Sequence, residues 1–409
     1  MLGQANLATV TGVVTDDTGA VIPGANVSIR NTGTNDVRQI STGAEGVYTI
    51  TALPPGGYEL KATSEGFRQY IEQGIQLQTG QNLRVDIMLE IGAVTESITV
   101  DAQMVTLNTE NGTIKGDVIV QEEIQELPLA GRDFTDLAFF TPGVVPKAQG
   151  GQGSGMNVNG ARASNTNFYV DGFDNRNARG AAAQVRPNID ALQEFKMEVS
   201  GYSAEYGRMA GGVMNMALRS GTNEFHGNLN YYLRNDVLDA LGFFEEEGNA
   251  LRQNQYAITI AGPIIKNKTF FMVSYEGLRK TEDQTRLNRV PTALERAGDF
   301  SQSLNVNGGP LYLRDRLKSG NCSASAKASC FPNNTIPADR IDPIGRKLMD
   351  TYPLVNRAGA GQVGYNYNTT AQDQDEWDSP LFKIDHKLGE NSLALRYQKR
   401  FNRTTNPFS

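Results

Sequence analysis

The sequence predicts a mainly β protein, and three observations support that prediction. The chain has 43 glycines among 409 residues, and with its many Asn and Thr residues it has the composition of a turn-rich β protein. Short strand-like runs separated by turn residues fill residues 8–90. Longer runs of alternating polar and apolar residues follow residue 223. The segment between them has a mixed pattern, so we expect a β-sandwich, a mixed α/β region and an extended antiparallel sheet in that order.

Charge and hydropathy exclude two broad classes of protein. A net charge of −7 argues against a general nucleic-acid-binding protein. No apolar run approaches the roughly 18–20 residues of a membrane-spanning helix. The first residues, MLGQANLATV, have neither the basic start nor the apolar centre of a signal peptide. A soluble all-β protein would have the same composition, so the motifs must decide whether a membrane is involved.

Residues 1–92 are predicted to form a β-sandwich. Runs such as 9–14 and 58–62 are separated by turns rich in Gly, Asn and Asp, at the spacing of about 8–12 residues typical of sandwich strands. The phrases TGVVTDDTGAVIPGANVSI, GVYTI and LPPGGYELKATSEGFRQY resemble the carboxypeptidase regulatory-like domain, a prealbumin-like sandwich related to starch-binding domains. The resemblance raises carbohydrate binding as a role. A folded spacer or docking module is the favoured alternative, because a core explains the aromatic residues equally well, namely Tyr48, Tyr58, Phe67 and Tyr70.

The residue types argue against an enzyme. The chain has two histidines, His226 and His386, and each lies in an alternating strand-like run. The HxxE and HExxH spacings are absent from the sequence, and two cysteines cannot form a zinc cluster. A GxSxG nucleophile turn is also absent. We therefore predict that the chain has no catalytic residue, no metal and no cofactor.

A succession of phrases between Asn157 and Arg279 gives the most specific signal in the sequence. In order they read NVNGAR (157–162), FYVDGFDNR (168–176), IDALQEFKME (189–198), SAEYGRMAGGVMNM (203–216), RSGTNEFHG (219–227), GPIIKNKTFF (262–271) and SYEGLR (274–279). Together they resemble the plug domain and first barrel strands of TonB-dependent outer-membrane receptors of the Oar-like (OmpA-related) branch. The resemblance implies a Gram-negative outer membrane with the N-terminal domain in the periplasm. It also implies TonB, energised by ExbB and ExbD, as a partner.

Residues 93–104 are expected to be a linker that carries the coupling strand. Part of this linker resembles a TonB box, and its residues are Glu96, Ser97, Ile98, Thr99, Val100, Asp101 and Ala102. A TonB box must be a short, extended, detachable segment, because its backbone adds a strand to the partner's sheet. Alternation of Ile98 and Val100 with polar residues meets that need. The alternative is a last strand of the sandwich or a plain linker.

Residues 105–222 are expected to form the plug, a mixed α/β domain. The pattern predicts two short helices within 118–144, ending at Pro128 and Pro142, and a further helix over 187–195. The phrases NVNGAR, FYVDG and GGVMNMAL are predicted to be strands, with Asp171 and Gly172 in a tight turn.

Polar contacts hold the plug inside the barrel in this family. The resemblance assigns such contacts to Arg162, Glu205 and Arg208. The alternative is that these three residues are ordinary solvated charges on plug turns.

Residues 223–409 are expected to form the N-terminal part of a transmembrane β-barrel. About five alternating strands are predicted, over residues 225–234, 254–262, 270–277, 381–388 and 392–400. Each has one polar and one apolar face, which fits lipid outside and an aqueous lumen inside, or equally one sheet of a soluble sandwich. Short turns at 265–268 and 389–391 alternate with long connections at 235–253 and 280–378. This asymmetry favours the barrel, since periplasmic turns are short and extracellular loops are long.

The two cysteines, Cys322 and Cys330, lie together in the long 280–378 connection. In an extracellular loop they would close a small disulfide ring, because that environment is oxidising. A pair of free thiols is the alternative.

The sequence therefore predicts an energy-coupled outer-membrane transporter. Its extracellular substrate would be too large or too scarce for porins, such as a siderophore, an oligosaccharide or a peptide, with import or export both open. Outer-membrane lipid and a surface lipoprotein are further expected partners, and nucleic acid is not. The alternative is a cell-surface adhesin or carbohydrate-binding protein built of β-sandwiches. The chain stops at TTNPFS without a terminal aromatic strand, so we expect it to be an N-terminal fragment of a longer receptor.

Overall fold

The computed structural model describes residues 7–92, 97–101, 115–127, 129, 132–147, 155–177, 179–202, 206, 211–240, 250–305, 307–357, 365–389 and 391–407. The chain divides into two units. The larger unit comprises Met1–Tyr232, Gln255–Leu278 and Trp377–Asn402, and the smaller comprises Leu233–Asn254, Arg279–Glu376 and Arg403–Ser409. Within the described residues, every helix is too short or too polar to cross a lipid bilayer.

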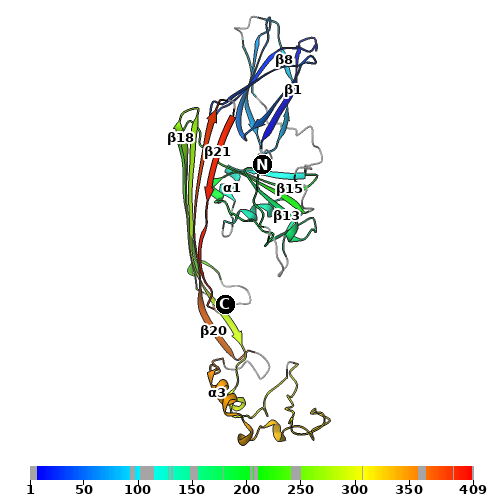
Figure 1. The fold of residues 1–409 in the computed structure, drawn as a ribbon, viewed down its shortest axis with the longest axis vertical. Coiled ribbons are helices and arrows are strands. Elements are labelled where there is room, and N and C mark those ends of the chain that lie inside the picture. Colours follow the sequence, from blue (N-terminus) through cyan, green and yellow to red (C-terminus); the bar gives the residue numbers. More distant parts are fainter. Residues whose placement is uncertain are drawn as a thin grey trace. The chain divides into compact units, whose positions relative to one another are not determined.

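The N-terminal part of the larger unit is a β-sandwich, drawn in blue in Figure 1. Its strands are β1 (Ala8–Asp16), β2 (Asn26–Asn31), β3 (Val37–Ser41), β4 (Val47–Leu53), β5 (Gly56–Thr63), β6 (Gln69–Leu77), β7 (Asn82–Arg84), β8 (Ile87–Leu89) and β9 (Ser97–Asp101). One sheet has the order β4-β1-β7, with β8 also paired to β1, and the other has the order β3-β2-β5-β6-β9. The sandwich predicted from the spacing of turn residues is therefore confirmed.

The core of the sandwich accounts for its aromatic residues. Strands β1 and β5 bury every second residue, as a strand with one face on a core should. Tyr48 and Tyr58 are almost fully buried, and their hydroxyls donate hydrogen bonds to the carbonyls of Val85 and Pro54, each at 2.7 Å. The side chains of Phe67 and Tyr70 pack against the same core. These four rings belong to the core and do not form an exposed sugar-binding platform.

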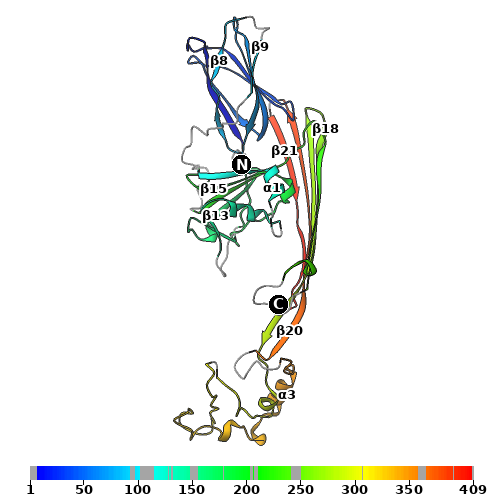
Figure 2. The same ribbon diagram turned by 180° about the vertical axis from the view of Figure 1, so that it is seen from behind.

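A third sheet follows in the larger unit, in cyan and green in Figure 2. Its order is β10-β15-β16-β13-β14, with β13 parallel to β16 and the other neighbours antiparallel. The strands are β10 (Lys115–Val120), β13 (Thr166–Val170), β14 (Phe173–Asp174), β15 (Leu192–Ser200) and β16 (Gly212–Leu218), and a separate hairpin pairs β11 (Val144–Pro146) with β12 (Met156–Val158). The helices are α1 (Gln121–Glu126), η1 (Phe134–Phe140), η2 (Ala163–Asn165) and η3 (Ile189–Ala191). We call this region, residues 115–218, the plug.

The structure corrects the predicted helices of the plug. Residues 118–120 belong to β10, and the second helix, η1, is a 3₁₀-helix. Phe134 and Leu137 of η1 are buried, whereas Phe140 is 51% exposed. The helix predicted over 187–195 is wrong, since η3 has only three residues and β15 follows it. Pairing of β15 with both β10 and β16 overrides the local helical preference, because it satisfies the backbone on both edges.

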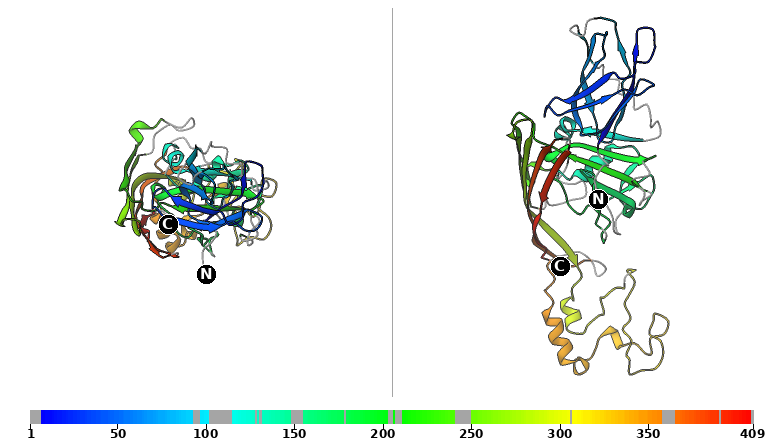
Figure 3. Two further views of the ribbon diagram at one scale, coloured as in Figure 1. Left: turned by 90° about the horizontal axis from the view of Figure 1, so that it is seen from above. Right: turned by 45° about the horizontal axis from the view of Figure 1, so that its top comes forward.

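The remaining strands form one open sheet with the order β17-β18-β19-β20-β21, and β22 pairs with β20. They are β17 (His226–Asn235), β18 (Leu251–Ile265), β19 (Thr269–Asn288), β20 (Tyr367–Leu388), β21 (Asn391–Gln398) and β22 (Phe401–Thr405). Figure 3 shows the green and red strands side by side in this sheet. The five predicted strands are confirmed. Strands β19 and β20 are longer than predicted, so the long connection is 289–366 instead of 280–378.

The strands of this sheet have the two faces that their alternation predicts. Leu229 is 77% exposed, and the other outward apolar residues include Tyr231, Ile258, Ile260, Phe382, Ile384, Leu393 and Leu395. Neighbouring residues such as Asn228 and Asn230 point instead to the plug.

Gly277 lies against the ring of Tyr256, where an added Cβ would be 2.5 Å from Cζ. A side chain at position 277 would displace the end of this ring, so glycine leaves the ring room to pack on the neighbouring strand.

The smaller unit contains the described part of the long connection. Its helices are η5 (Asp236–Leu238), α2 (Ala293–Arg296), η6 (Pro332–Asn334), η7 (Ala338–Arg340) and α3 (Pro343–Thr351). A capping box of Thr292 and Glu295 begins α2, and Asp342 caps α3 by accepting hydrogen bonds from two backbone amides.

Candidate functional site

The plug meets strand β17 at an ion pair that is buried within the plug and hydrogen-bonded to two residues of β17. Nη2 of Arg132 donates to Oδ1 of Asp190 at 2.6 Å, and the two side chains are 5% and 0% exposed. Asn230 of β17 donates to the same Asp190 oxygen at 2.8 Å. Nη1 of Arg132 donates to the hydroxyl of Tyr232 at 2.5 Å, and its guanidinium lies over that ring, 4.3 Å from the centroid. We call Arg132, Asp190, Asn230 and Tyr232 the Asp190 cluster.

Electrostatics in the Asp190 cluster are dominated by burial. Loss of solvent raises the pKa of Asp190, and Arg132 opposes that shift by its charge and its hydrogen bond. Burial likewise lowers the pKa of Arg219, which donates to Asn228 of β17 at 3.2 Å. Arg132 adopts the left-handed conformation, with φ of 51°. This conformation costs about 1–3 kcal/mol and persists only where the surrounding structure fixes it. The hydrogen bonds from its side chain to Asp190 and Tyr232 fix Arg132 in this conformation.

A second contact joins the plug to strands β20 and β21. Asp171 has φ of 48° in the turn after β13, and its Oδ1 accepts a hydrogen bond from the Leu218 amide at 2.8 Å. Its Oδ2 lies 3.5 Å from Nζ of Lys383 and 3.4 Å from Nη1 of Arg396. The tight turn predicted at YVDG is therefore present. It also presents a carboxylate to two basic side chains of the sheet.

Further polar and apolar contacts complete the interface. The Asn188 amide donates to Oγ of Ser274 at 3.0 Å and to the Ser379 carbonyl at 3.1 Å. The apolar core of the plug also takes in side chains from the open sheet, namely Ala261, Met272 and Leu381. The plug thus completes its core with residues of β18, β19 and β20.

Of the three predicted plug–barrel contact residues, the structure describes Arg162 alone. Arg162 is exposed at the residue before η2. In the described part of the chain, its guanidinium has no contact with the open sheet. Glu205 and Arg208 lie outside the described residues. The roles of these three residues stay a prediction.

Sequence reasoning missed Arg132, Asp171 and Asp190. A usable signal was present, since each is a charge directly beside an apolar run, in GRDF, YVDG and NIDAL.

The candidate TonB box lies at the edge of the sandwich. Ser97–Asp101 form β9, which pairs in parallel with β6, so that Gln69 faces Ser97 and Gln73 faces Asp101. Val100 is 39% exposed, and Glu96 and Ala102 lie outside the described residues. The segment is extended, as strand addition requires, and it is also the last strand of the sandwich, as the alternative predicted. Its coupling role stays a prediction.

The sandwich contacts the plug at one buried carboxylate. The amide and the hydroxyl of Thr79 both donate to Oε2 of Glu194 at 2.7 Å. Thr79 and Glu194 are buried. Burial raises the pKa of Glu194, and the two bonds from Thr79 oppose that shift. Gln193 adds a hydrogen bond to the Pro55 carbonyl at 3.4 Å.

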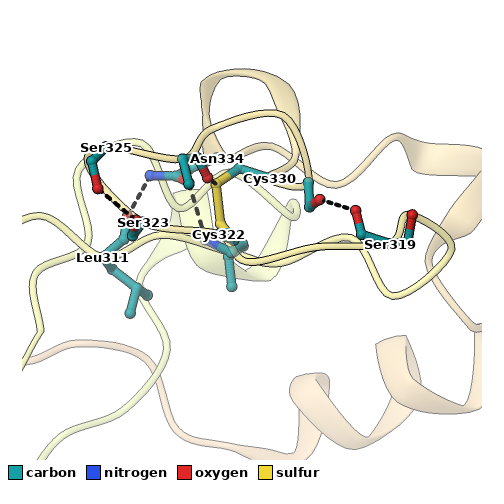
Figure 4. The surroundings of a disulfide bond; sticks show 10 residues. Leu311, Ser319, Cys322, Ser323, Ser325, Cys330 and Asn334 are labelled. Atoms are coloured by element: carbon teal, nitrogen blue, oxygen red, sulfur yellow. Dashed lines mark hydrogen bonds between the residues drawn. A yellow bond between two sulfur atoms is a disulfide. The ribbon is translucent and has the colours of Figure 1, made fainter.

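The smaller unit is held together by a disulfide and an ion pair. Cys322 and Cys330 are joined with their Cα atoms 5.0 Å apart, and the nearby loop is tied by a hydrogen bond from Ser329 to the Ser319 carbonyl (Figure 4). Arg340 donates to both carboxylate oxygens of Asp315 at 2.8 Å, and these bonds lower the pKa of Asp315. Disulfide formation in exported protein stays a prediction that peptide mapping under non-reducing conditions can check.

Comparisons with known proteins agree with this architecture. Family models match in sequence order: the carboxypeptidase regulatory-like domain at 9–90, the TonB-dependent receptor plug domain at 109–213 and an outer membrane β-barrel domain at 217–409. A plug followed by an outer-membrane barrel defines a class, the plugged receptors of the outer membrane. The chain belongs to the TonB-dependent receptors of the Oar-like type.

Two curated relatives and one solved structure show the extent of the likeness. The chain is 30% identical over 289 residues to the TonB-dependent transporter Oar of Myxococcus xanthus, covering 66% of this chain and 27% of that protein. It is 26% identical over 192 residues to a protein of Acinetobacter baumannii described as the "probable TonB-dependent siderophore receptor PirA", covering 42% and 24%. The crystal structure of the outer membrane transporter YddB from Escherichia coli matches with a TM-score of 0.39 and 14% identity, covering 70% of this chain and 33% of that one. The chain therefore spans only about a quarter of the length of these curated relatives.

Proposed function

We propose that this chain supplies the periplasmic sandwich, the plug and part of the barrel of an energy-coupled outer-membrane transporter. The observation that carries the proposal is the polar interface between the plug and the open sheet. If the plug moves, the residues of the sheet that it leaves behind must be ones that water can solvate. The Asp190 and Asp171 contacts meet that requirement, since their partners in the sheet are Asn230, Tyr232, Lys383 and Arg396.

The energetics of this interface fit a process that consumes work. Moving the plug away from the sheet breaks the hydrogen bonds from Asn230 to Asp190 and from Arg132 to Tyr232, and each hydrogen bond to a charged group contributes about 1.5–3 kcal/mol, so thermal motion rarely opens this interface. An external pull can supply that free energy. The transporter then has two states of the plug with different affinities for substrate. In the closed state the plug blocks the lumen, and in the open state the substrate passes.

TonB, energised by ExbB and ExbD, is the partner that would pull, and residues 96–102 would be its docking segment. The expected substrate is a siderophore, an oligosaccharide or a peptide captured by extracellular loops, with a surface lipoprotein as a further partner. Exposed apolar residues of the open sheet, such as Leu229 and Ile260, would face lipid. The matched plug and barrel domains favour a receptor over the adhesin alternative.

The substitution Ile98→Pro in the full-length receptor tests this function. Proline removes one backbone donor and fixes φ, which a paired strand tolerates poorly. We expect the variant to bind its substrate at wild-type affinity and to lose TonB-dependent uptake. Ile98→Val is the matched control, because it keeps both the donor and the preference for extended backbone.

Wild-type uptake by Ile98→Pro would remove residues 96–102 as the coupling segment. Docking would then have to occur elsewhere, for example ahead of the sandwich at residues 6–10. Loss of both substrate binding and uptake would indicate a folding defect, which the circular dichroism spectrum of the purified variant would reveal.

A further inference from the structure

The sandwich has no assigned role, and its outermost strand is the candidate coupling segment. Strand β9 is the last strand of the order β3-β2-β5-β6-β9 (Figure 2). Its five residues pair with β6 in continuous parallel register, without a bulge. In the part of the chain that the structure describes, no strand pairs with the other edge of β9. The sandwich therefore holds an extended segment by one edge, and among the described residues no strand occupies the second edge.

This open edge lacks the features that usually block strand addition. Natural edge strands are protected by proline, lysine, bulges or covering side chains. The sequence of β9, SITVD, contains neither proline nor lysine. At the opposite edge of the same sheet, β3 carries Arg38, whose guanidinium reaches the Thr51 carbonyl in β4 at 3.4 Å. The two edges differ, and β9 is the edge suited to another strand.

Backbone geometry allows β9 to bond on both sides at once. Successive residues of a strand direct their N–H and C=O groups to alternate edges. The residues of β9 that bond β6 therefore leave the intervening residues free to bond a strand on the other side. Ordering a backbone segment costs conformational entropy. Pairing with β6 orders the segment in advance, so a partner strand meets an edge that is already extended.

We propose that the sandwich is a docking module that presents β9 as a preformed edge, to which TonB adds an extended strand without displacing β9 from β6. This inference rests on the proposed function, since it takes residues 97–101 as the coupling segment. It assigns a role to the sandwich and places that domain in the path of the applied force. Thr79, in the turn that follows β6, carries the contact to Glu194 of the plug, so a pull on β9 reaches the plug through β6 as well as along the chain.

A reversible cross-link between β6 and β9 tests the proposal. Ile71 and Thr99 are direct partners in the parallel register. Neighbouring strands lie about 4.8 Å apart, within the range of about 4.4–6.8 Å between Cα atoms that a disulfide spans. The full-length receptor carrying Ile71→Cys and Thr99→Cys is titrated with the soluble periplasmic domain of TonB, oxidised and then reduced. Wild-type receptor under the same reductant controls for reduction of Cys322–Cys330, and Thr99→Cys alone controls for the altered side chain.

We expect the Kd of the oxidised variant to stay within about twofold of the reduced variant. A loss of about tenfold or more on oxidation, restored by reduction, would overturn the proposal, because it would show that β9 must leave the sandwich. If oxidation weakened binding in this way and Ile98→Pro also lost TonB binding, residues 96–102 would still be the coupling segment. If wild-type receptor and Ile98→Pro bind TonB equally, the coupling segment lies elsewhere, and both the docking edge and the proposed segment are wrong.

Discussion

The sandwich and the plug bury their apolar residues in different ways. Among the residues that the structure describes, the sandwich core is built only from those between Ala8 and Leu89, so this domain closes its own core. The plug core runs from Ile119 to Leu218 and also takes in Ala261, Met272 and Leu381 from the open sheet. A domain that closes its own core can move as a rigid body. A domain that shares its core with a neighbour changes its own stability whenever the neighbour moves away.

The ion pairs of the sandwich and the plug also differ, because the first is exposed and the second is buried. In the sandwich, Arg30 and Glu59 lie 3.2 Å apart with 39% and 22% of their side chains exposed. Such a pair contributes about 0–1 kcal/mol, because water competes with it. The Arg132–Asp190 pair of the plug is buried, and removing one partner leaves the other charge without solvent. The plug is therefore the region in which single charge substitutions have large effects.

The largest effect is expected for Asp190→Ala. It leaves Arg132 buried without its counter-ion and takes the acceptor from Asn230, so we expect a loss of about 3–5 kcal/mol in the stability of the plug. Chemical unfolding of the receptor in detergent, followed by protease sensitivity of the plug, measures it. Arg30→Ala in the sandwich is the matched control, with an expected change below about 1 kcal/mol. Equal losses in both variants would contradict the contrast between the two regions.

A core truncation in the sandwich is expected to have a large but local effect. Leu60 is fully buried, and Leu60→Ala should destabilise the sandwich by about 2–5 kcal/mol. Because the sandwich closes its own core, hydrogen exchange should rise across β1–β6 and stay unchanged in β15 and β16. For Met272→Ala in the open sheet, exchange should instead rise in the plug. A rise in plug exchange with Leu60→Ala would show that the sandwich core is not independent.

The contact between sandwich and plug should depend on pH. Burial raises the pKa of Glu194 above its ordinary value of 4.5. The contribution of this group is therefore fully present below about pH 4.5 and is lost as pH rises through the higher folded pKa. Hydrogen exchange at the Thr79 amide should speed up across that interval. Glu194→Gln should abolish the dependence, and a pH profile unchanged in that variant would assign the titration to another group.

The smallest effect is expected for Arg162→Ala. The side chain is exposed, and substitutions at such positions change stability by no more than about 0.5 kcal/mol. Denaturant midpoints of this variant and of Arg132→Ala, measured side by side, should differ clearly. A loss comparable to that of Arg132→Ala would assign Arg162 a buried partner and restore it as a plug–barrel contact.

Most strands could be predicted from the sequence, whereas the contacts between domains could not. Alternation of polar and apolar residues is local, so the strands at 226–235 and 391–398 were visible in the sequence. The helix predicted over 187–195 overlaps the first residues of the strand over Leu192–Ser200, because that strand depends on β10 and β16, which are distant in sequence. The same holds for Asp190, whose partners Arg132 and Asn230 are separated from it by 58 and 40 residues. Local pattern carries no information on such pairings.

The glycine at position 277 bears on the register of strands β18 and β19 in the open sheet. If β18 slipped by one residue against β19, the side chain of Glu276 or Leu278 would replace Gly277 beside the Tyr256 ring. That ring would then have to swing away from Asp378, whose carboxylate accepts the hydrogen bond from the Tyr256 hydroxyl at 3.4 Å. A slipped pair would therefore lose this hydrogen bond and the packing of the ring on the glycine. The tyrosine and glycine together favour the native register over a one-residue slip.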